Sequence, residues 1–401
     1  MQPILSLLPA FALAAAAVQQ PLSNPLAAEK PYRHDLLALH KSLVSTSSTS
    51  RNESAVGHLL KDYLEENGFT TQLLPLSGSL SAKPTRFNLL AWPASVSKSS
   101  GRVLLTSHID VVPPHIPYSI SDSPSRISPS TRISGRGSVD AKGSVAAQVI
   151  AMRQLLAAQA VDPSAVALLY VVGEEINGDG MEAFAATLAS GAVDMAVDAA
   201  IFGEPTEGKL ACGHKGGVFC RMRAHGKAAH SGYPELGKSA NEALVLALAR
   251  IVTTDLGTSE KYGRTTVNIG RVDGGVAANV IPAEAFADLG IRVAIGPTET
   301  GGEIVRQRVE EIMKEVDEEM ELECGQSTYG VVECECSVPG FQTTIESYGT
   351  DIPHFRHNHT NYLYGPGSIL VAHGDNEALT VGDLEEAVEG FQKLVLHALA
   401  N

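Results

Sequence analysis

One apolar stretch constrains the fold more than any other part of the chain. Residues 165–172 are all apolar and Gly173 ends the run, after which Glu174 and Glu175 follow directly. A short apolar run closed by glycine predicts a strand that is buried on both faces. Two adjacent carboxylates at the end of such a strand repel each other unless a cation is near or one stays protonated. Ligands of open α/β sheets bind at this end of the strands, so the pair indicates either a ligand site or a solvated acidic turn.

Three further apolar runs also lead to side chains that bind metals. The runs cover residues 103–108, 196–203 and 368–373, and a glycine-rich loop at 135–143 carries another carboxylate. Because parallel strands place their carboxyl ends on one edge of a sheet, we expect the side chains at these ends to lie together. Three carboxylates and two imidazoles suit two zinc-like ions with one bridging carboxylate. The expected ligands are His108, Asp140, Glu175, Glu204 and His373.

The residue two positions beyond His108 is expected to support this ligand. Residues two apart share one face of an extended chain, so Asp110 can lie behind His108 and accept its second ring proton.

The chain length of 401 residues suits two domains. We expect an α/β domain with a central, mostly parallel sheet over residues 31–215 and 326–401, interrupted by a compact α+β unit over 216–325. Within the insert, His230 and Asn279 lie in polar, loop-like segments, where His230 is as typical of a capping residue as of a catalytic one. The expected helices are 32–43, 53–67, 144–159, 181–188, 238–251, 303–318 and 380–399, and the expected strands of the insert are 218–224, 265–272 and 285–293.

The N-terminus is expected to direct export. Residues 4–18 are apolar or small and too few to span a bilayer, and Ala15 to Ala17 fit a small-x-small cleavage site. We predict a signal peptide over residues 1–17, the alternative being a buried N-terminal helix. The sequons at Asn52 and Asn358 agree with a secreted, extracellular glycoprotein. No membrane partner is expected.

The net charge argues against one class of partner, and the cysteine count limits the disulfide pairing. The net charge of −15 argues against nucleic acid, whose phosphates it would repel. Five cysteines leave at least one thiol unpaired within the chain, and none has zinc-finger spacing. Cys212 and Cys220 flank residues 214–217 and could bridge a hairpin.

Five motifs in order carry a resemblance to a known family. They are His108-Ile-Asp-Val-Val-Pro113, Gly135-Arg-Gly-Ser-Val-Asp-Ala-Lys-Gly143, Gly173-Glu-Glu175, Gly203-Glu-Pro-Thr206 and the late His373. With these motifs the chain resembles the co-catalytic zinc amidohydrolases, which include aminoacylase, acetylornithine deacetylase, succinyl-diaminopimelate desuccinylase and carboxypeptidase G. The likeness covers nearly the whole chain after the leader.

The resemblance implies a zinc-binding α/β domain interrupted by a lid or dimerisation domain, with two zinc ions per subunit. By the same likeness Asp140 bridges the ions, His108 and Glu204 hold one, and Glu175 and His373 hold the other.

Roles for the remaining residues also come from the resemblance. Glu174 is implied to be the general base, and Asp110 to orient His108. His230 and Asn279 are implied to bind the developing oxyanion or a substrate carboxylate, and Arg292 resembles the lid arginine that grips that carboxylate. Dimeric members pair through the inserted domain, so a homodimer is expected.

These inferences predict a secreted two-zinc hydrolase of amide bonds. The leading substrate is a peptide or acyl-amino acid with a free C-terminal carboxylate, which makes the protein a metallocarboxypeptidase. The alternatives are an N-acyl-amino-acid deacylase and a non-catalytic zinc-binding or receptor-like relative. Loss of Glu174 or of a ligand would favour the last, and all are present. The family often has Asp-x-Arg in the lid, where this chain has Gly290-Ile-Arg292.

Overall fold

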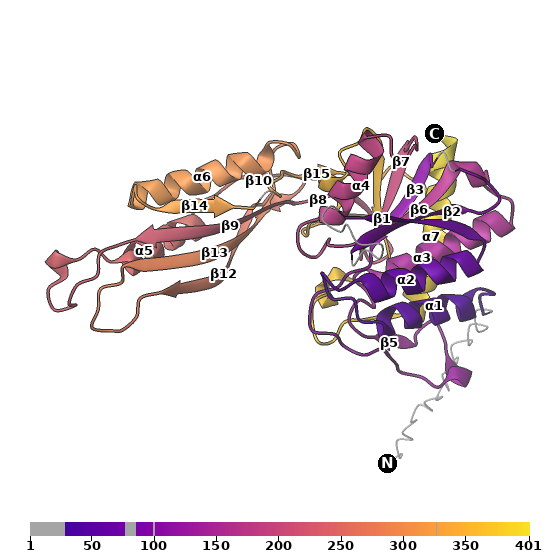
Figure 1. The fold of residues 1–401 in the computed structure, drawn as a ribbon, viewed down its shortest axis with the longest axis horizontal. Coiled ribbons are helices and arrows are strands. Elements are labelled where there is room, and N and C mark those ends of the chain that lie inside the picture. The colour runs from indigo at the N-terminus through magenta and orange to yellow at the C-terminus, as the bar shows by residue number, and fades with distance from the viewer. Residues whose placement is uncertain (1–28, 77–85, 99–100, 326) are drawn as a thin grey trace, which may run out of the picture.

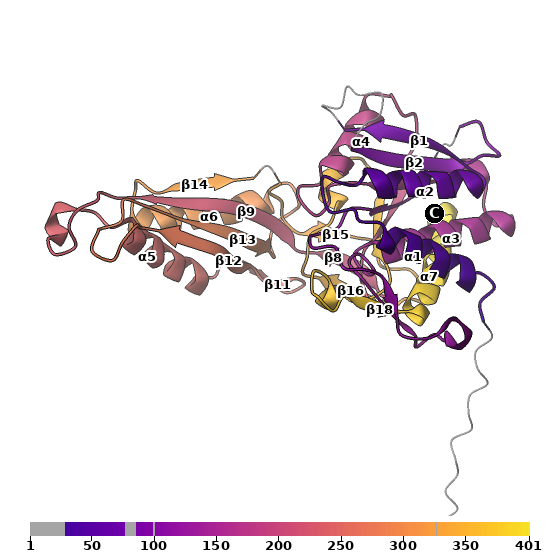
Figure 2. The same cartoon turned by 60° about the horizontal axis from the view of Figure 1, so that its bottom comes forward.

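The computed structural model describes residues 29–76, 86–98, 101–325 and 327–401, and it shows two lobes joined by a narrow neck (Figures 1 and 2). The expected signal peptide, residues 1–17, lies outside the described residues. Within the described part, no helix is both long and apolar enough to cross a membrane.

A mixed sheet forms the centre of the larger lobe. In the described part of the chain it has nine strands, and its four central strands are parallel while the pairings beyond them are largely antiparallel. The mostly parallel sheet expected from the sequence is therefore parallel only at its centre. In spatial order the strands are β1 (Phe69–Pro75), β2 (Phe87–Pro93), β6 (Val166–Val171), β3 (Val103–His108), β7 (Ala199–Gly203), β17 (Thr360–Tyr364), β8 (Leu210–His214) and β15 (Val332–Glu333), with β16 (Thr343–Glu346) beside β8.

Helices cover both faces of this sheet, which explains the continuous apolar run in β6. Leu168 and Tyr170 belong to the core beneath four helices on one face, whereas Ala167 and Leu169 pack with the fifth helix on the other face. The four helices are α1 (Arg33–Ser45), α2 (Ser54–Glu66), α3 (Lys142–Ala157) and α7 (Val381–Ala400), and the fifth is α4 (Asp179–Ala189). Thr380 and Asp383 form a capping box at the start of α7.

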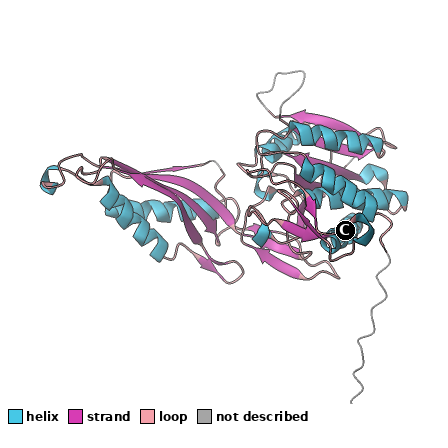
Figure 3. Cartoon of the chain, turned by 90° about the horizontal axis from the view of Figure 1, so that it is seen from below, coloured by secondary structure: helices cyan, strands magenta, loops and turns pink. Residues whose placement is uncertain are grey.

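The smaller lobe, called the lid below, is an antiparallel sheet with helices on one face only (Figure 3). Alternate residues of its central strands, such as Met222 and Ala287, pack beneath both helices, and the opposite face of the sheet is open. Its elements are β12 (Thr266–Gly274), β13 (Glu284–Val293), β9 (Gly216–His225) and β14 (Glu321–Cys324) in spatial order, with α5 (Ala240–Thr253) and α6 (Gly301–Val316).

The remaining described elements are short. They are β4 (Ser119–Ile120), β5 (Arg132–Ser134), β10 (Thr258–Ser259), β11 (Gly263–Arg264), β18 (Ala378–Thr380) and the 3₁₀ turns η1 (Pro124–Arg126), η2 (Pro163–Ala165), η3 (Pro234–Leu236), η4 (Ile352–His354) and η5 (Ile369–Val371).

The strand expected over residues 368–373 is wrong. This segment contains the 3₁₀ turn η5, and the strand that enters the sheet is β17, which ends at Tyr364. The apolar run misleads because it is not buried: Leu370 is 86% exposed, whereas Leu363 of β17 is fully buried.

The disulfide considered between Cys212 and Cys220 is also wrong. The structure pairs Cys212 with Cys336 and Cys220 with Cys324, and it leaves Cys334 as the free thiol among the five cysteines, all of which are described. Cys212 lies on β8 in the central sheet and Cys220 on β9 in the lid sheet, so the two strands do not form a hairpin.

Candidate active site

Three parallel strands bring their C-terminal residues to one edge of the central sheet. His108 is the last residue of β3, Glu204 follows β7, and Glu174 and Glu175 follow β6 after the turn at Gly173. Nε2 of His108 lies 3.8 Å from Oε1 of Glu204 and 4.0 Å from Oε2 of Glu174. The parallel order β6-β3-β7 thus brings these side chains together from separate parts of the sequence.

The two remaining expected ligands come from loops. Asp140 lies just before α3, and one of its carboxylate oxygens is 3.0 Å from Nε2 of His108 while the other is 3.3 Å from Nε2 of His373. The same nitrogen of His373 is 3.0 Å from Oε2 of Glu175. Asp140 therefore lies between two imidazoles, with Glu204 on the side of His108 and Glu175 on the side of His373.

The electrostatics of this cluster favour positive charge on both sides of Asp140. Burial and the neighbouring carboxylates raise the pKa of Glu204, and they likewise raise the pKa of Glu175. Although burial opposes ionisation of Asp140, hydrogen bonds with His108 and His373 hold its pKa well below the usual range. Hydrogen bonds with Asp140 and Glu175 raise the pKa of His373 to about 10. Carboxylates so concentrated and buried need cations beside them.

The donor set fits divalent metal ions. Ligand atoms of His108, Asp140 and Glu175 all lie within 4.8 Å of one another. Oε1 of Glu175 is buried and has no hydrogen-bond partner among the described residues, which leaves a carboxylate oxygen free to bind a cation. Imidazole nitrogens and carboxylate oxygens are the usual ligands of catalytic zinc.

Asp110 supports the cluster in a different way from that expected. The backbone carbonyl of Asp110, at 2.9 Å, is the nearer partner of Nδ1 of His108, and the Asp110 carboxylate is 3.7 Å away. Because a carbonyl only accepts, Nδ1 carries the proton and Nε2 faces Asp140. The Asp110 carboxylate accepts hydrogen bonds from the backbone N–H groups of Gly173 at 2.8 Å and Glu174 at 3.3 Å. It thereby fixes the turn that carries the two glutamates.

A buried ion pair, the Arg136–Glu377 clamp, joins the two ligand loops. The guanidinium of Arg136 lies 2.7 Å from Oε2 of Glu377 and donates to the carbonyl of His373 at 3.2 Å. Oε1 of Glu377 accepts the backbone N–H of Asp140 at 3.2 Å and that of the preceding residue at 3.0 Å. The clamp thus holds the backbones of two expected ligands that lie far apart in sequence.

A cavity of about 280 Å³ opens onto the carboxylate cluster, and the lid forms one of its walls. Arg292, on β13 of the lid, lies in this wall beside Phe219 of β9. The larger lobe, called the catalytic lobe below, contributes Asp351, which is buried and has one carboxylate oxygen without a hydrogen-bond partner among the described residues. The structure therefore brings Arg292 to the expected metal site within one chain.

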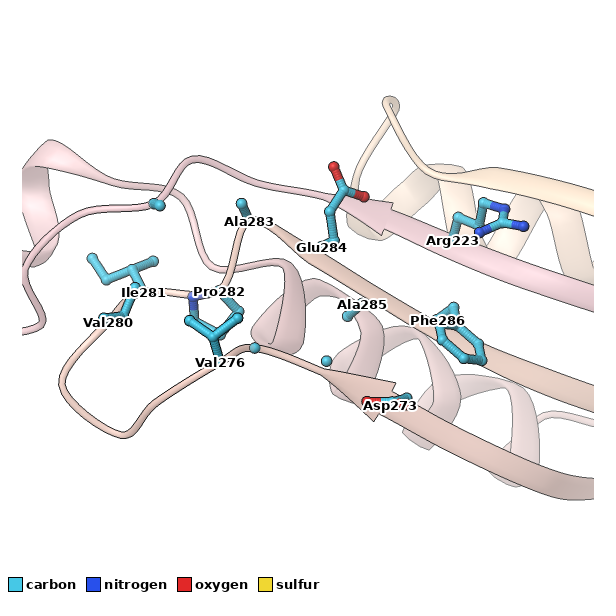
Figure 4. Close-up of a pocket in the computed structure, with 13 residues that line it drawn as sticks. Arg223, Asp273, Val276, Val280, Ile281, Pro282, Ala283, Glu284, Ala285 and Phe286 are labelled. Carbon is cyan, nitrogen blue, oxygen red and sulfur yellow. The ribbon is translucent and has the colours of Figure 1, made fainter.

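His230 and Asn279 lie together but not in this cavity. The N–H of Ser231 donates to the carbonyl of Asn279 at 3.1 Å, and both polar loops are at the end of the lid farthest from the catalytic lobe (Figure 1). A second cavity of about 410 Å³ occupies this end, and its largely apolar lining includes Val276, Val280 and Ile281 (Figure 4). It shares no lining residue with the carboxylate cavity.

Sequence reasoning missed the clamp, Phe219 and Asp351. A usable signal existed for the clamp, because Arg136 lies inside the glycine-rich motif and Glu377 follows His373 by four residues. The local sequence around either residue does not indicate that the two form an ion pair, because they lie 241 positions apart.

Comparisons with known proteins agree with this geometry. Residues 212–321 match the family model described as "Peptidase dimerisation domain" (M20_dimer). The chain is 55% identical to a "Peptidase M20 domain-containing protein" of Sordaria macrospora, over 92% of this chain and 86% of that protein. It is 44% identical to a "Probable carboxypeptidase" of Aspergillus niger, over 98% of both.

Solved structures share the fold at low sequence identity. A tripeptidase from Staphylococcus aureus matches with a TM-score of 0.73 at 21% identity, covering 92% of this chain and 99% of that one. An M20 family metallo-carboxypeptidase from Sulfolobus solfataricus matches with a TM-score of 0.68 at 16% identity, covering 92% and 100%. Taken with the identity to full-length relatives, the two-lobed fold and the carboxylate–imidazole cluster show that the chain belongs to the M20 family of peptidases.

Proposed function

We propose that this peptidase is a secreted, zinc-dependent carboxypeptidase that acts on peptides or acyl-amino acids with a free C-terminal carboxylate. The observation that carries the proposal is the presence of Arg292 in the same cavity as Asp140, Glu175 and His373. An arginine binds a carboxylate through charge-assisted, bidentate hydrogen bonds. The "Probable carboxypeptidase" relatives support the same substrate class.

The metal ions are assigned to the ligands that flank Asp140. His108 and Glu204 would hold one zinc ion, Glu175 and His373 would hold a second, and Asp140 would serve both. When bound, the zinc ions supply a water of lowered pKa and polarise the scissile carbonyl.

The remaining steps fall to residues of the chain. Glu174 borders the cluster and takes the proton of the attacking water, then passes it to the leaving amine. Arg292 binds the substrate carboxylate and so fixes which amide bond faces Glu174. Asp110 keeps the turn before Glu174 in place through its hydrogen bonds to that backbone.

Blocking the substrate carboxylate tests this proposal. Amidation of the C-terminus should lower kcat/KM about 100-fold, because loss of a desolvated arginine–carboxylate pair costs a few kcal/mol. The measurement compares blocked dipeptides and N-acyl-amino acids, free and amidated, before and after removal of metal by a chelator. Hydrolysis of acyl-amino acids alone would favour the deacylase alternative, and equal cleavage of free and amidated substrates would contradict the carboxylate requirement.

The same experiment with Arg292→Ala tests whether this one residue causes the requirement for a free C-terminal carboxylate. The variant should cleave free and amidated substrates equally, at the rate at which the unaltered enzyme cleaves the amidated one. Arg221→Ala is the matched control, because Arg221 lies on the same open face of the lid and pairs with Asp288 outside the cavity.

We also propose that two chains pair through the lid, which places His230 of the partner subunit at the active site. β12 forms an edge of the lid sheet, and Val272 on this strand is exposed together with Val245 and Leu246 of α5. An unpaired strand edge flanked by exposed apolar side chains is suited to pairing with a second copy. Such pairing explains why His230 and Asn279 lie outside the cavity of their own chain: they serve the partner, where they bind the oxyanion or the substrate carboxylate.

Subunit mixing tests this arrangement. His230→Ala and Glu174→Gln chains, each inactive alone, should regain part of the activity when mixed, because one site of the mixed dimer has both residues. If activity stays absent after subunit exchange is verified by native mass spectrometry, His230 acts within its own chain or outside catalysis.

Secretion is proposed on separate grounds. The apolar leader lies in the first 28 residues, and the described chain contains two disulfides, which persist in oxidising compartments. Asn52 and Asn358 are both exposed, as glycosylation requires.

A further inference from the structure

The lid wall of the cavity has an aromatic surface beside Arg292. Phe219 is 48% exposed and lines the cavity, and the Arg292 guanidinium lies 5.5 Å from the centre of its ring. An aromatic side chain left this exposed beside a cation offers a packing surface to whatever that cation binds.

Two glycines make room for this ring. In the pairing of β9 with β13, Phe219 lies opposite Gly290, and Arg292 lies opposite Gly217. A Cβ atom at Gly290 would lie 3.5 Å from the ring, and one at Gly217 would lie 3.2 Å from it. The ring therefore rests over backbone at both positions. A side chain at position 290, where the related Asp-x-Arg motif has a carboxylate, would share this space with Phe219 and would offer Arg292 a partner in place of the substrate.

The rest of the cavity lining fits an apolar substrate group. Ile176 and Ile369 line it together with Phe219, and Arg292 is the one lysine or arginine among its described lining residues. The acidic members are Asp140, Glu174, Glu175, Glu204 and Asp351. Asp140, Glu175 and Glu204 are the proposed zinc ligands, so bound ions would offset their charge. An acidic substrate side chain next to an α-carboxylate already bound by Arg292 would still face Glu174 and Asp351 and find no second lysine or arginine in the described lining, which is unfavourable.

We propose that Phe219, seated over Gly217 and Gly290, is the specificity-determining residue that packs against the side chain of the substrate's C-terminal residue. The protein should accordingly prefer substrates that end in an aromatic or large aliphatic residue over those that end in alanine or glutamate. This inference rests on the proposed carboxypeptidase function, because it requires that Arg292 hold the C-terminal carboxylate.

The test uses the full-length, zinc-loaded protein and four blocked dipeptides that end in Phe, Leu, Ala or Glu. The unaltered enzyme should show a kcat/KM for Phe and Leu at least about tenfold above that for Ala, the discrimination expected of an apolar contact. Phe219→Ala should lose about tenfold on Phe and Leu and change by no more than about threefold on Ala. Phe219→Leu should retain most of the preference for Leu, since it keeps an apolar side chain.

Phe286→Ala is the matched control. Phe286 lies on the same open face of the lid, with the guanidinium of Arg221 4.6 Å from its ring centre, but it does not line the carboxylate cavity. Figure 4 shows it on β13, next to Arg223 of the adjacent strand β9. Its removal should leave the ratio between the four substrates unchanged, and melting curves of both variants check the fold.

Two outcomes overturn the inference and are distinguishable. If the unaltered enzyme cleaves free-carboxylate substrates without regard to the terminal side chain, or Phe219→Ala slows all four equally, Phe219 does not determine specificity and the proposed function stands. If none of the four is cleaved with zinc present, the proposed function fails and the inference fails with it.

Discussion

Glu174→Gln is expected to retain two bound metal ions per chain and to lose turnover by about 10²- to 10⁴-fold, the range that a general base contributes. The amide keeps the size and shape of the carboxylate but cannot accept the proton of the attacking water. Glu174 lies 4.0 Å from Nε2 of His108 and makes no contact with His373 among the ion pairs of the described residues, so it borders the cluster rather than bridging it. Elemental analysis of the purified variant, together with kcat, measures both effects.

The neighbouring residue is the control for this prediction. Oε2 of Glu175 is 3.0 Å from Nε2 of His373, and its other oxygen has no partner among the described residues. Glu175→Gln should therefore weaken metal binding as well as turnover. Equal metal loss in the two variants would reverse or remove the roles assigned to these adjacent glutamates.

Glu377→Gln, which breaks the Arg136–Glu377 clamp, is expected to lower both the free energy of unfolding and the affinity for metal. Arg136 and Glu377 are 2% and 1% exposed, so Glu377→Gln leaves a buried guanidinium without its counter-charge. Breaking a buried pair in this way commonly costs about 3–5 kcal/mol of unfolding free energy. The variant should also bind metal more weakly, because the backbone of Asp140 and the carbonyl of His373 lose a shared support. Denaturant unfolding measures the first effect, and chelator competition under native conditions measures the second.

A second buried ion pair in the same lobe is the control that distinguishes an effect on stability from an effect on metal binding. Arg33 on α1 and Glu385 on α7 are joined at 2.6 Å and 3.0 Å, and neither is near the ligand loops in the described hydrogen bonds. Glu385→Gln should destabilise the protein to a similar degree and leave metal affinity unchanged. If Glu377→Gln behaves in the same way as Glu385→Gln in both measurements, the clamp stabilises the lobe without positioning the ligands.

The sequence predicts well those parts of the site that depend on local burial. The strands before His108, Glu174 and Glu204 are recognisable because both faces of the central sheet are covered, which leaves uninterrupted apolar runs. His373 shows the limit of the same reasoning. Its apolar neighbours form a 3₁₀ turn that is not buried, and the residue reaches Asp140 through a loop whose path depends on long-range contacts.

Contacts between distant segments account for the other differences. The cysteine pairing depends on which sheet each strand joins, and Cys212 and Cys220 join different sheets. The carbonyl of Asp110 lies nearer to His108 than its carboxylate does, because the carboxylate accepts from the backbone of the turn after β6, 63 residues later. Nothing in the local sequence specifies these partners.

The Cys212–Cys336 bond has a consequence for how the enzyme survives other proteases. The two cysteines lie on the catalytic lobe just before the chain enters the lid and just after it returns, 124 residues apart. A single backbone cut anywhere in the lid therefore leaves both halves of the catalytic lobe covalently tethered, and the proposed metal ligands before and after the lid remain in one molecule. The exposed loops at the far end of the lid can thus be nicked in a protease-rich medium without releasing His373 from its partners at the active site.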